Sequence, residues 1–274
     1  MWISKKIIYL TSAILVSGVI YTACKSVAVT GRKQLSLIPE SQMIAMANDQ
    51  YAQVIQQGPL STNAAQTAMI KRVGNTIKTA VEKYMAEQGR SKDLEGYNWE
   101  FNLIQNDSTV NAWCMPGGKV AFYTGILPVC IDEAGVAVVM GHEVAHAIAR
   151  HGNERMSQEM VAQTGGQVGS IALSSKSPAT QSIFQQAYGV GAQLGVILPY
   201  SRKHESEADQ MGLVFMAMAG YDPNQAVAFW ERMKAASGGQ APPEFMSTHP
   251  ANERRIADLK AYLPEALKYY HPTK

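Results

Sequence analysis

The spacing of apolar residues predicts two helices near the start of the chain. Over 41–57, apolar residues recur at helical intervals, and the apolar side consists of Met43, Ile44, Met46, Tyr51 and Val54. Ser41 is expected to cap this helix at its N-terminus. A second helical pattern covers 63–88, and Gly89 is expected to stop it.

Alternation replaces helical spacing in the next part of the chain. Polar residues alternate with Trp99, Phe101 and Leu103, which is the pattern of a half-buried strand over 98–105. Two short runs of strand character then flank Pro116-Gly117-Gly118 and predict a hairpin over 110–125. Together these patterns predict an α+β fold that is mainly helical and contains a small sheet.

An apolar run over 134–148 encloses three polar side chains. Apart from Ala, Val, Met, Ile and Gly it contains only His142, Glu143 and His146. Asp132 is expected to cap this helix, which is predicted to run to about His151. A polar patch on a buried helix needs partners, and a bound metal ion supplies them.

The polar patch has the H-E-x-x-H pattern of zinc peptidases. His142 and His146 lie four residues apart, so both can reach one metal ion from one face of a helix. Glu143 can face a water molecule without being a ligand, and we expect it to act as the general base in peptide hydrolysis. The alternative is a chance pattern in a structural protein.

The hairpin predicted over 110–125 could bind substrate if it lies beside this helix. Asn111 and Ala112 are expected to begin an edge strand next to the metal-binding helix. An extended substrate could then pair with the backbone of that strand, which would hold a peptide without reading much of its sequence. The plain alternative is a hairpin with no role in binding.

Length and charge add limits. A chain of 274 residues with 46% apolar content can form one or two globular domains. The only charged residues among the first 23 are Lys5 and Lys6, and the remainder has 22 basic and 22 acidic residues. This balance gives no electrostatic reason to expect binding to nucleic acid or to an anionic membrane surface.

The N-terminus is predicted to direct export. Lys5 and Lys6 precede a mainly apolar stretch that is short for a membrane span. Cys24 then follows small residues, as in a bacterial lipobox, although Tyr21 stands where leucine is usual. We expect a lipid anchor on Cys24; simple cleavage and an uncleaved anchor are alternatives. The predicted domains are a signal peptide (1–23), a lipid-anchored lead-in segment (24–40) and a zinc metallopeptidase domain (41–274).

Two further features concern the body of the chain. In an oxidising compartment Cys114 and Cys130 could form a disulfide, the alternative being two buried thiols. Residues 152–200 are rich in Gly, Ser, Gln and Ala. We interpret them as broken helical segments, which pack through small residues or form a mobile lid over the cleft.

A catalytic zinc usually has a third protein ligand, and the residues just after His146 do not supply it. Position 149 is Ala and position 152 is Gly, so the motif does not extend to a third histidine in the H-E-x-x-H-x-x-G-x-x-H register. His151 misses that register by one residue. The ligand is therefore expected from elsewhere in the chain.

The acidic stretch 205–209 is the best source of this ligand. Glu205 and Asp209 lie about one helical turn apart, so Glu205 can bind the metal while Asp209 orients a ligating histidine. Glu207 is an alternative to Glu205, although it also suits the solvated start of a helix. Local sequence does not choose between the two glutamates.

Several motifs occur in one order along the chain. They are Thr30-Gly31-Arg32, Asn111-Ala112 with Pro116-Gly117-Gly118, Tyr123-Thr124-Gly125, His142 to His146, Tyr200-Ser201-Arg202, Glu205-Ser206-Glu207-Ala208-Asp209, and Ser247-Thr248-His249-Pro250 with Arg255-Ile256. In this ordered set the chain resembles the gluzincin peptidase family of the CAAX prenyl protease and HtpX, peptidase family M48. Within it, the chain is similar to the bacterial envelope quality-control proteases, in a form without a helical-repeat domain.

The resemblance implies a zincin-type fold and a set of site residues. One zinc ion would be held by His142, His146 and Glu205, and Asp209 would orient a ligand. From the residues alone, a His-Pro pair before a helix is expected to be a surface cap. By the resemblance, His249 would instead lie close to the metal, where it either stabilises the oxyanion or binds the zinc and holds the enzyme off. Arg255 would brace the site or its loop, and the loop 238–243 is flexible enough to move His249.

The sequence thus predicts a zinc metalloendopeptidase of the bacterial cell envelope, periplasmic or associated with the outer membrane. Its expected substrates are misfolded or unassembled envelope proteins in extended form. The alternative is a chaperone-like or latent zinc protein whose site is closed by His249. The chain shows no set of transmembrane helices and no helical repeat before Lys274, so partners are expected at the cleft or the bare surface.

Overall fold

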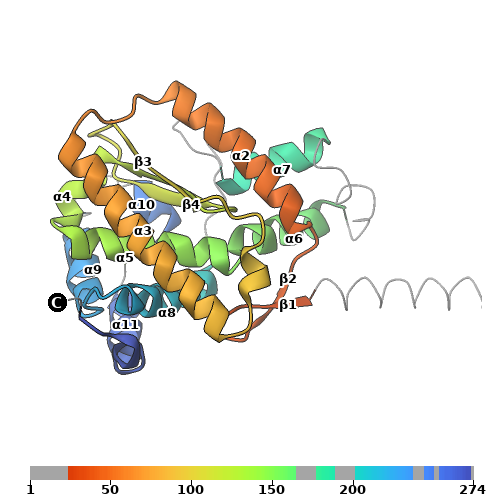
Figure 1. Cartoon of the computed structure of the whole chain (residues 1–274). Coiled ribbons are helices and arrows are strands. Elements are labelled where there is room, and N and C mark those ends of the chain that lie inside the picture. Colours follow the sequence, from red (N-terminus) through yellow and green to blue (C-terminus); the bar gives the residue numbers. More distant parts are fainter. Residues whose placement is uncertain (1–23, 165–176, 189–200, 237–243, 250–252, 273–274) are drawn as a thin grey trace, which may run out of the picture.

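The computed structural model describes residues 24–164, 177–188, 201–236, 244–249 and 253–272 (Figure 1). Its helices are α2 (Glu40–Gln57), α3 (Ala64–Glu87), α4 (Leu127–Cys130), α5 (Glu133–Ile148), α6 (His151–Thr164), α7 (Pro178–Tyr188), α8 (Arg202–Met218), α9 (Gln225–Ala236), α10 (Glu244–Thr248) and α11 (Glu253–Ala266). Its strands are β1 (Cys24–Ser26), β2 (Lys33–Leu35), β3 (Glu100–Ile104), β4 (Ala112–Met115) and β5 (Lys119–Tyr123). The predicted α+β, mainly helical fold is confirmed.

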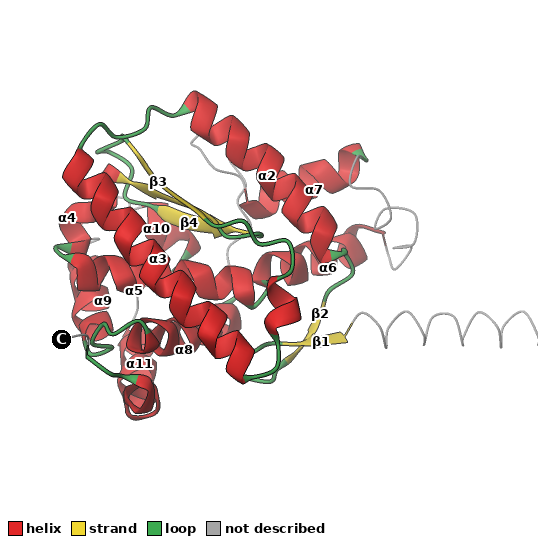
Figure 2. Ribbon diagram, in the orientation of Figure 1, coloured by secondary structure: helices red, strands yellow, loops and turns green. Residues whose placement is uncertain are grey.

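The main sheet has three strands in the order β3-β5-β4. Figure 2 draws its strands in yellow and labels β3 and β4. β3 and β5 are parallel, and β4 and β5 form the antiparallel hairpin predicted around the Pro-Gly-Gly turn. β4 lies at an edge of this sheet and contacts α5, whereas α3 packs beside β3. The predicted strand beside the metal-binding helix is therefore an edge strand.

Helix α5 forms the centre of the core. Asp132 caps it as predicted, because its Oδ1 atom accepts a hydrogen bond of 2.9 Å from the backbone N–H of Gly135. Every residue from Gly135 to Ile148 is buried, and the apolar ones belong to the largest hydrophobic cluster. The polar residues of this helix are therefore held where water cannot compensate for a lost partner.

Two glycines let α5 and α8 approach closely. A Cβ atom added at Gly141 would lie 2.9 Å from the carbonyl oxygen of Gly212, and one added at Gly212 would lie 3.0 Å from Gly141 and His142 backbone atoms. Real Cβ atoms essentially never come closer than this to backbone atoms. The helix that carries the histidine pair thus lies almost backbone to backbone against the helix that carries Glu205.

α5 ends earlier than the sequence suggested. Ala149 is its C-cap, Arg150 has a positive φ of 57°, and α6 begins at His151. A non-glycine residue in this left-handed conformation marks a sharp change of direction in the chain. His151 consequently lies on a new helix whose start turns back toward the histidine pair.

The N-terminal helices follow the predicted pattern with one difference. The predicted apolar side of α2 is buried, but the residue before this helix is Pro39 and no side chain caps it, so Ser41 lies within the first turn. Pro39 suits this position because a helix start leaves backbone N–H groups unpaired anyway. α3 follows Asn63, whose side chain accepts a hydrogen bond from the N–H of Gln66, and Gly89 has a φ of +66°.

Cys114 and Cys130 are free thiols, so the disulfide considered from the sequence is not formed. Cys114 lies on β4 and Cys130 ends α4, and both are buried in the largest hydrophobic cluster. Burial raises the pKa of the Cys114 thiol well above its ordinary value. Both cysteines act as small apolar residues of the core, which was the alternative interpretation.

Several predictions concern residues outside the described ranges. These are the signal peptide at 1–23, 24 of the 49 residues of the segment 152–200 and the loop 238–243. The division into a lead-in segment and a catalytic domain also stays a prediction. Within the described ranges no single helix is long and apolar enough to cross a membrane.

The close contact between α5 and α8 predicts whether one glycine-to-alanine substitution raises or lowers the stability of the protein. Gly→Ala inside a helix ordinarily stabilises a protein by about 1 kcal/mol. We expect Gly212→Ala to destabilise this protein by about 1–3 kcal/mol, because the new methyl group must push the two helices apart. Urea unfolding measures the difference, and an equal or higher stability would show that the helices are not so close.

Candidate metal centre

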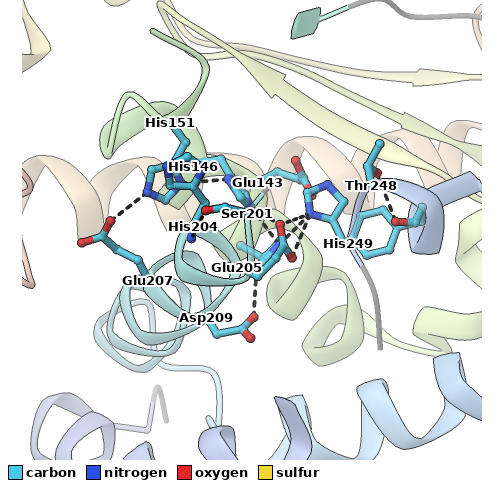
Figure 3. Close-up of polar contacts among 12 residues, drawn as sticks. Glu143, His146, His151, Ser201, His204, Glu205, Glu207, Asp209, Thr248 and His249 are labelled. Carbon is cyan, nitrogen blue, oxygen red and sulfur yellow. Dashed lines mark hydrogen bonds and ion pairs between the residues drawn. The ribbon is translucent and has the colours of Figure 1, made fainter. Parts of the chain in front are cut away.

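Four buried side chains from three parts of the chain converge on one point. Figure 3 labels three of them, His146, Glu205 and His249. α5 supplies His142 and His146, α8 supplies Glu205, and His249 follows α10. His142 Nε2 lies 3.1 Å from His146 Nε2 and 3.1 Å from His249 Nδ1. The Glu205 carboxylate lies 3.5 Å from His142 Nε2, 3.4 Å from His146 Nε2 and 3.0 Å from His249 Nδ1.

This donor set fits a tetrahedral zinc ion. Zinc–nitrogen and zinc–oxygen bonds of about 2.0–2.1 Å place the ligand atoms at the corners of a tetrahedron with edges of roughly 3.3 Å. Five distances between possible ligand atoms are 3.0–3.5 Å and lie around that value, with both Glu205 oxygens taking part. One ligand atom from each of the four residues lies within 4.8 Å of the other three. Burial also holds the pKa of His146 well below its ordinary value, so the ring is neutral and able to ligate.

The geometry separates the two candidate glutamates. Residues two positions apart on a helix point in directions about 200° apart. Glu205 faces the histidines of α5. Glu207 points away from them, and its carboxylate lies 2.7 Å from Arg32 Nε and 3.0 Å from His151 Nε2. Glu207 is only 3% exposed, so its interpretation as part of a solvated helix start was wrong.

Asp209 and Arg255 surround the donor set with hydrogen bonds. His142 Nδ1 lies 3.0 Å from Asp209 Oδ1, which directs Nε2 toward the other donors. Arg255 donates to both Asp209 oxygens, at 2.6 and 2.8 Å, and lies 2.9 Å from Glu205. Its guanidinium also lies 3.4 Å from the ring centre of Trp230. The structure brings both residues to the positions expected from the sequence.

Glu143 lies beside the cluster and not in it. Its Oε1 atom is buried without a hydrogen-bond partner in the part of the chain that the structure describes, and His249 Nε2 is 3.5 Å away. Burial raises the pKa of this carboxyl to about 7. A carboxylate with an unused oxygen and such a pKa is suited to proton transfer at neutral pH.

His249 is held in place by its own short helix. Its backbone N–H donates to the carbonyl of Phe245 at 2.8 Å, and the Phe245 ring packs 4.7 Å from the imidazole. The N–H of Phe245 donates in turn to the carbonyl of Val110, just before β4. The side chain predicted to lie close to the metal thus occupies the fourth donor position.

The predicted substrate strand is present, but its start is buried. The backbone carbonyl of Asn111 accepts a hydrogen bond from the N–H of Tyr123, so the backbone of Asn111 is directed toward β5. The Asn111 side chain accepts a second hydrogen bond, of 2.8 Å, from the N–H of Ala112. Ala112 is 1% exposed. The placement of Asn111 and Ala112 at the edge strand is as expected, and their role in substrate binding stays a prediction.

Sequence reasoning missed a second polar cluster behind His146. It contains Thr30, Arg32, His151, Glu154, His204 and Glu207. Two of its members had been noticed in the sequence: Thr30-Gly31-Arg32 belonged to the ordered set of motifs, and His151 missed the register of a third metal ligand by one residue. Their connection required the turn at Arg150, which brings His151 back toward α5.

A helix-borne H-E-x-x-H pair completed by a carboxylate from a second helix is the arrangement of a gluzincin-type metallopeptidase. The model of Peptidase family M48 matches residues 72–263, and the chain belongs to this family. It is a zinc metalloendopeptidase, as predicted from the sequence.

The relatives include mitochondrial and bacterial proteases. The chain is 35% identical to "Mitochondrial metalloendopeptidase OMA1" of Schizosaccharomyces pombe over 269 residues, which are 96% of this chain and 74% of that protein. It is 30% identical to the Saccharomyces cerevisiae protein of the same name over 258 residues, 91% of this chain and 72% of the relative. It is 31% identical over 166 residues to "Beta-barrel assembly-enhancing protease" of Escherichia coli, with 59% of this chain and 34% of the relative covered.

These comparisons contradict the predicted location in a bacterial periplasm or outer membrane. Two relatives that each match more than nine-tenths of the chain are named as mitochondrial enzymes. The error has a physical source, since basic residues followed by an apolar stretch target a membrane without specifying which one. Lipidation of Cys24 is untested, because that side chain lies outside the described part.

Proposed function

We propose that this enzyme cleaves unfolded protein segments at a zinc centre held by His142, His146 and Glu205. The observation that carries the proposal is the buried set of ligand atoms, all within 4.8 Å of one another, next to a Glu143 oxygen that has no hydrogen-bond partner among the described residues. Zinc in such a site supplies Lewis acidity and an activated water at neutral pH. The protein supplies the base, the orientation of the ligands and the substrate-binding surface.

Glu143 is the general base of the proposal. Its Oε1 atom takes a proton from the attacking water and delivers it to the leaving amine of the substrate. A pKa of about 7 in the absence of metal suits both steps, and the positive charge of a bound metal would favour the ionised form that accepts the first proton. Asp209 and Arg255 hold His142 and Glu205 in orientation while the charges change.

The substrate would bind in extended form along β4. The outer edge of this strand pairs with no other strand among the described elements. Backbone pairing there accepts many sequences, which suits misfolded or unassembled proteins as substrates. A relative named for enhancing β-barrel assembly supports a role in the handling of incompletely assembled proteins.

A latent form is the second candidate, and the position of His249 favours it. Four protein donors close a zinc site, whereas a catalytic site keeps one position open. His249 Nδ1 lies 3.1 Å from His142 Nε2 and 3.0 Å from Glu205, in the place of the open position. In this form His249 withdraws before cleavage.

The first test separates metal binding from catalysis. We expect Glu143→Gln to keep about one zinc ion per chain and to lower cleavage of an unfolded model protein by about 10²–10⁴-fold, because the amide cannot accept the proton. Zinc content is measured by elemental analysis and cleavage by gel electrophoresis. Undiminished cleavage by the variant would contradict the assignment of the base.

A second test concerns His249. We expect His249→Ala to raise the rate of cleavage while the zinc content stays near one per chain, because the fourth donor is removed and the other three remain. Glu143→Gln combined with His249→Ala is the control for contaminating proteases. A fall of about 10²–10³-fold would instead make His249 a stabiliser of the oxyanion and reject the latent form.

A further inference from the structure

The two α5 histidines are supported from behind in different ways. Asp209 contacts His142 Nδ1 directly, at 3.0 Å. Behind His146 there is another histidine: His151 Nδ1 lies 2.9 Å from His146 Nδ1. The far side of that ring, Nε2, lies 3.0 Å from Glu207 Oε2 (Figure 3). A carboxylate thus supports each α5 histidine, once directly and once through an intervening imidazole.

Chemistry fixes the direction of these hydrogen bonds. If His146 uses Nε2 as a ligand, its proton must be on Nδ1, which then donates to His151 Nδ1. His151 Nδ1 is therefore the acceptor, so its own proton is on Nε2 and is donated to Glu207. Only one tautomer of each ring allows both hydrogen bonds, from His146 to His151 and from His151 to Glu207. The carboxylate of Glu207 selects that pair of tautomers, because it can only accept.

The N-terminal segment holds the far end of the chain of hydrogen bonds. Arg32 Nε donates to Glu207 Oε2 at 2.7 Å, and the Thr30 hydroxyl donates to the other Glu207 oxygen. The remaining nitrogens of Arg32 bind both oxygens of Glu154 at 2.8 and 2.6 Å. Glu154 also accepts from His204, whose ring stacks on His151 at 4.5 Å.

This network is too deeply buried to be a surface ion pair. His151 is fully buried, Glu207 is 3% exposed and Glu154 is 5% exposed. Buried ionic groups often add little to stability compared with apolar residues of the same size. A function in fixing geometry explains why these groups converge on the back of His146.

We propose that His151, Glu207 and Arg32 form a relay that sets the tautomer and orientation of His146, and with them the affinity of the site for metal. The proposal rests on the proposed function of His146 as a zinc ligand. The three are positioning residues that touch neither metal nor substrate. Because Arg32 lies between β1 and β2, docking of the N-terminal segment is coupled to the metal centre.

The experiment measures zinc affinity and stability separately in the full chain. Zinc dissociation constants are obtained by competition with a chromophoric chelator, and urea unfolding of the metal-free proteins gives their stability. Cobalt in place of zinc reports ligand geometry through its visible absorption. The variants are His151→Leu, His151→Asn, which keeps an acceptor near Nδ1, and Arg32→Met. Lys119→Met is the matched control, since Lys119 is a buried cation paired with Glu100 away from the site.

We expect His151→Leu to weaken zinc binding by about 10–100-fold and to change the cobalt spectrum, because disruption of a bond behind a ligand has effects of this size. His151→Asn should recover part of the affinity. Arg32→Met should weaken binding several-fold, whereas Lys119→Met should lower stability alone. If His151→Leu does not fold, Thr30→Val is used in its place, because Thr30 is exposed and donates to Glu207. We expect this variant to weaken zinc binding several-fold.

Two outcomes are informative in different ways. Zinc affinities within two-fold of wild type for His151→Leu and Arg32→Met, with reduced stability, would overturn the relay and leave a structural role. His146→Ala is measured alongside: if it also binds zinc normally, the proposed metal site itself has failed.

Discussion

The distance between α5 and α8 is the constraint on which the site depends. His142 and His146 belong to one helix and Glu205 to the other, and their donor atoms meet at 3.4–3.5 Å only because Gly141 and Gly212 remove the side chains between the backbones. The contact lies in the largest hydrophobic cluster, so apolar packing holds the polar groups together. Packing of α5 against α8 thus sets the positions of these three candidate ligands before any metal binds.

Charge compensation makes this burial tolerable. Burial opposes ionisation of Glu205, yet its close contacts with His249 and Arg255 hold its pKa well below the ordinary value. Arg255 is bound in turn by Asp209 and covered by the Trp230 ring. Behind His146, Glu154 behaves similarly: burial is outweighed by His204 and Arg32, and its pKa falls to about 2. The site is therefore enclosed by paired charges on two sides.

Local patterns were sufficient to predict the helix that carries the histidine pair and the hairpin beside it. The apolar run predicted α5, Asp132 predicted its start, and the Pro-Gly-Gly turn predicted the hairpin beside it. Contacts between distant segments could not be derived in this way. No residue near Glu207 indicates that it contacts Arg32, which lies 175 positions away in the sequence. The turn that redirects His151 was also not predictable, because the residue with positive φ there is Arg150 and not a glycine. The choice of Glu205 over Glu207 came from the family resemblance and agrees with the geometry.

The central claim is that His142, His146 and Glu205 bind one zinc ion in the buried cluster. Its most direct test is a crystal structure of zinc-loaded Glu143→Gln, with diffraction data collected on both sides of the zinc absorption edge. The account predicts one anomalous peak about 2.0–2.2 Å from both histidine Nε2 atoms and from a Glu205 oxygen. A peak elsewhere, or none at saturating zinc, would contradict it.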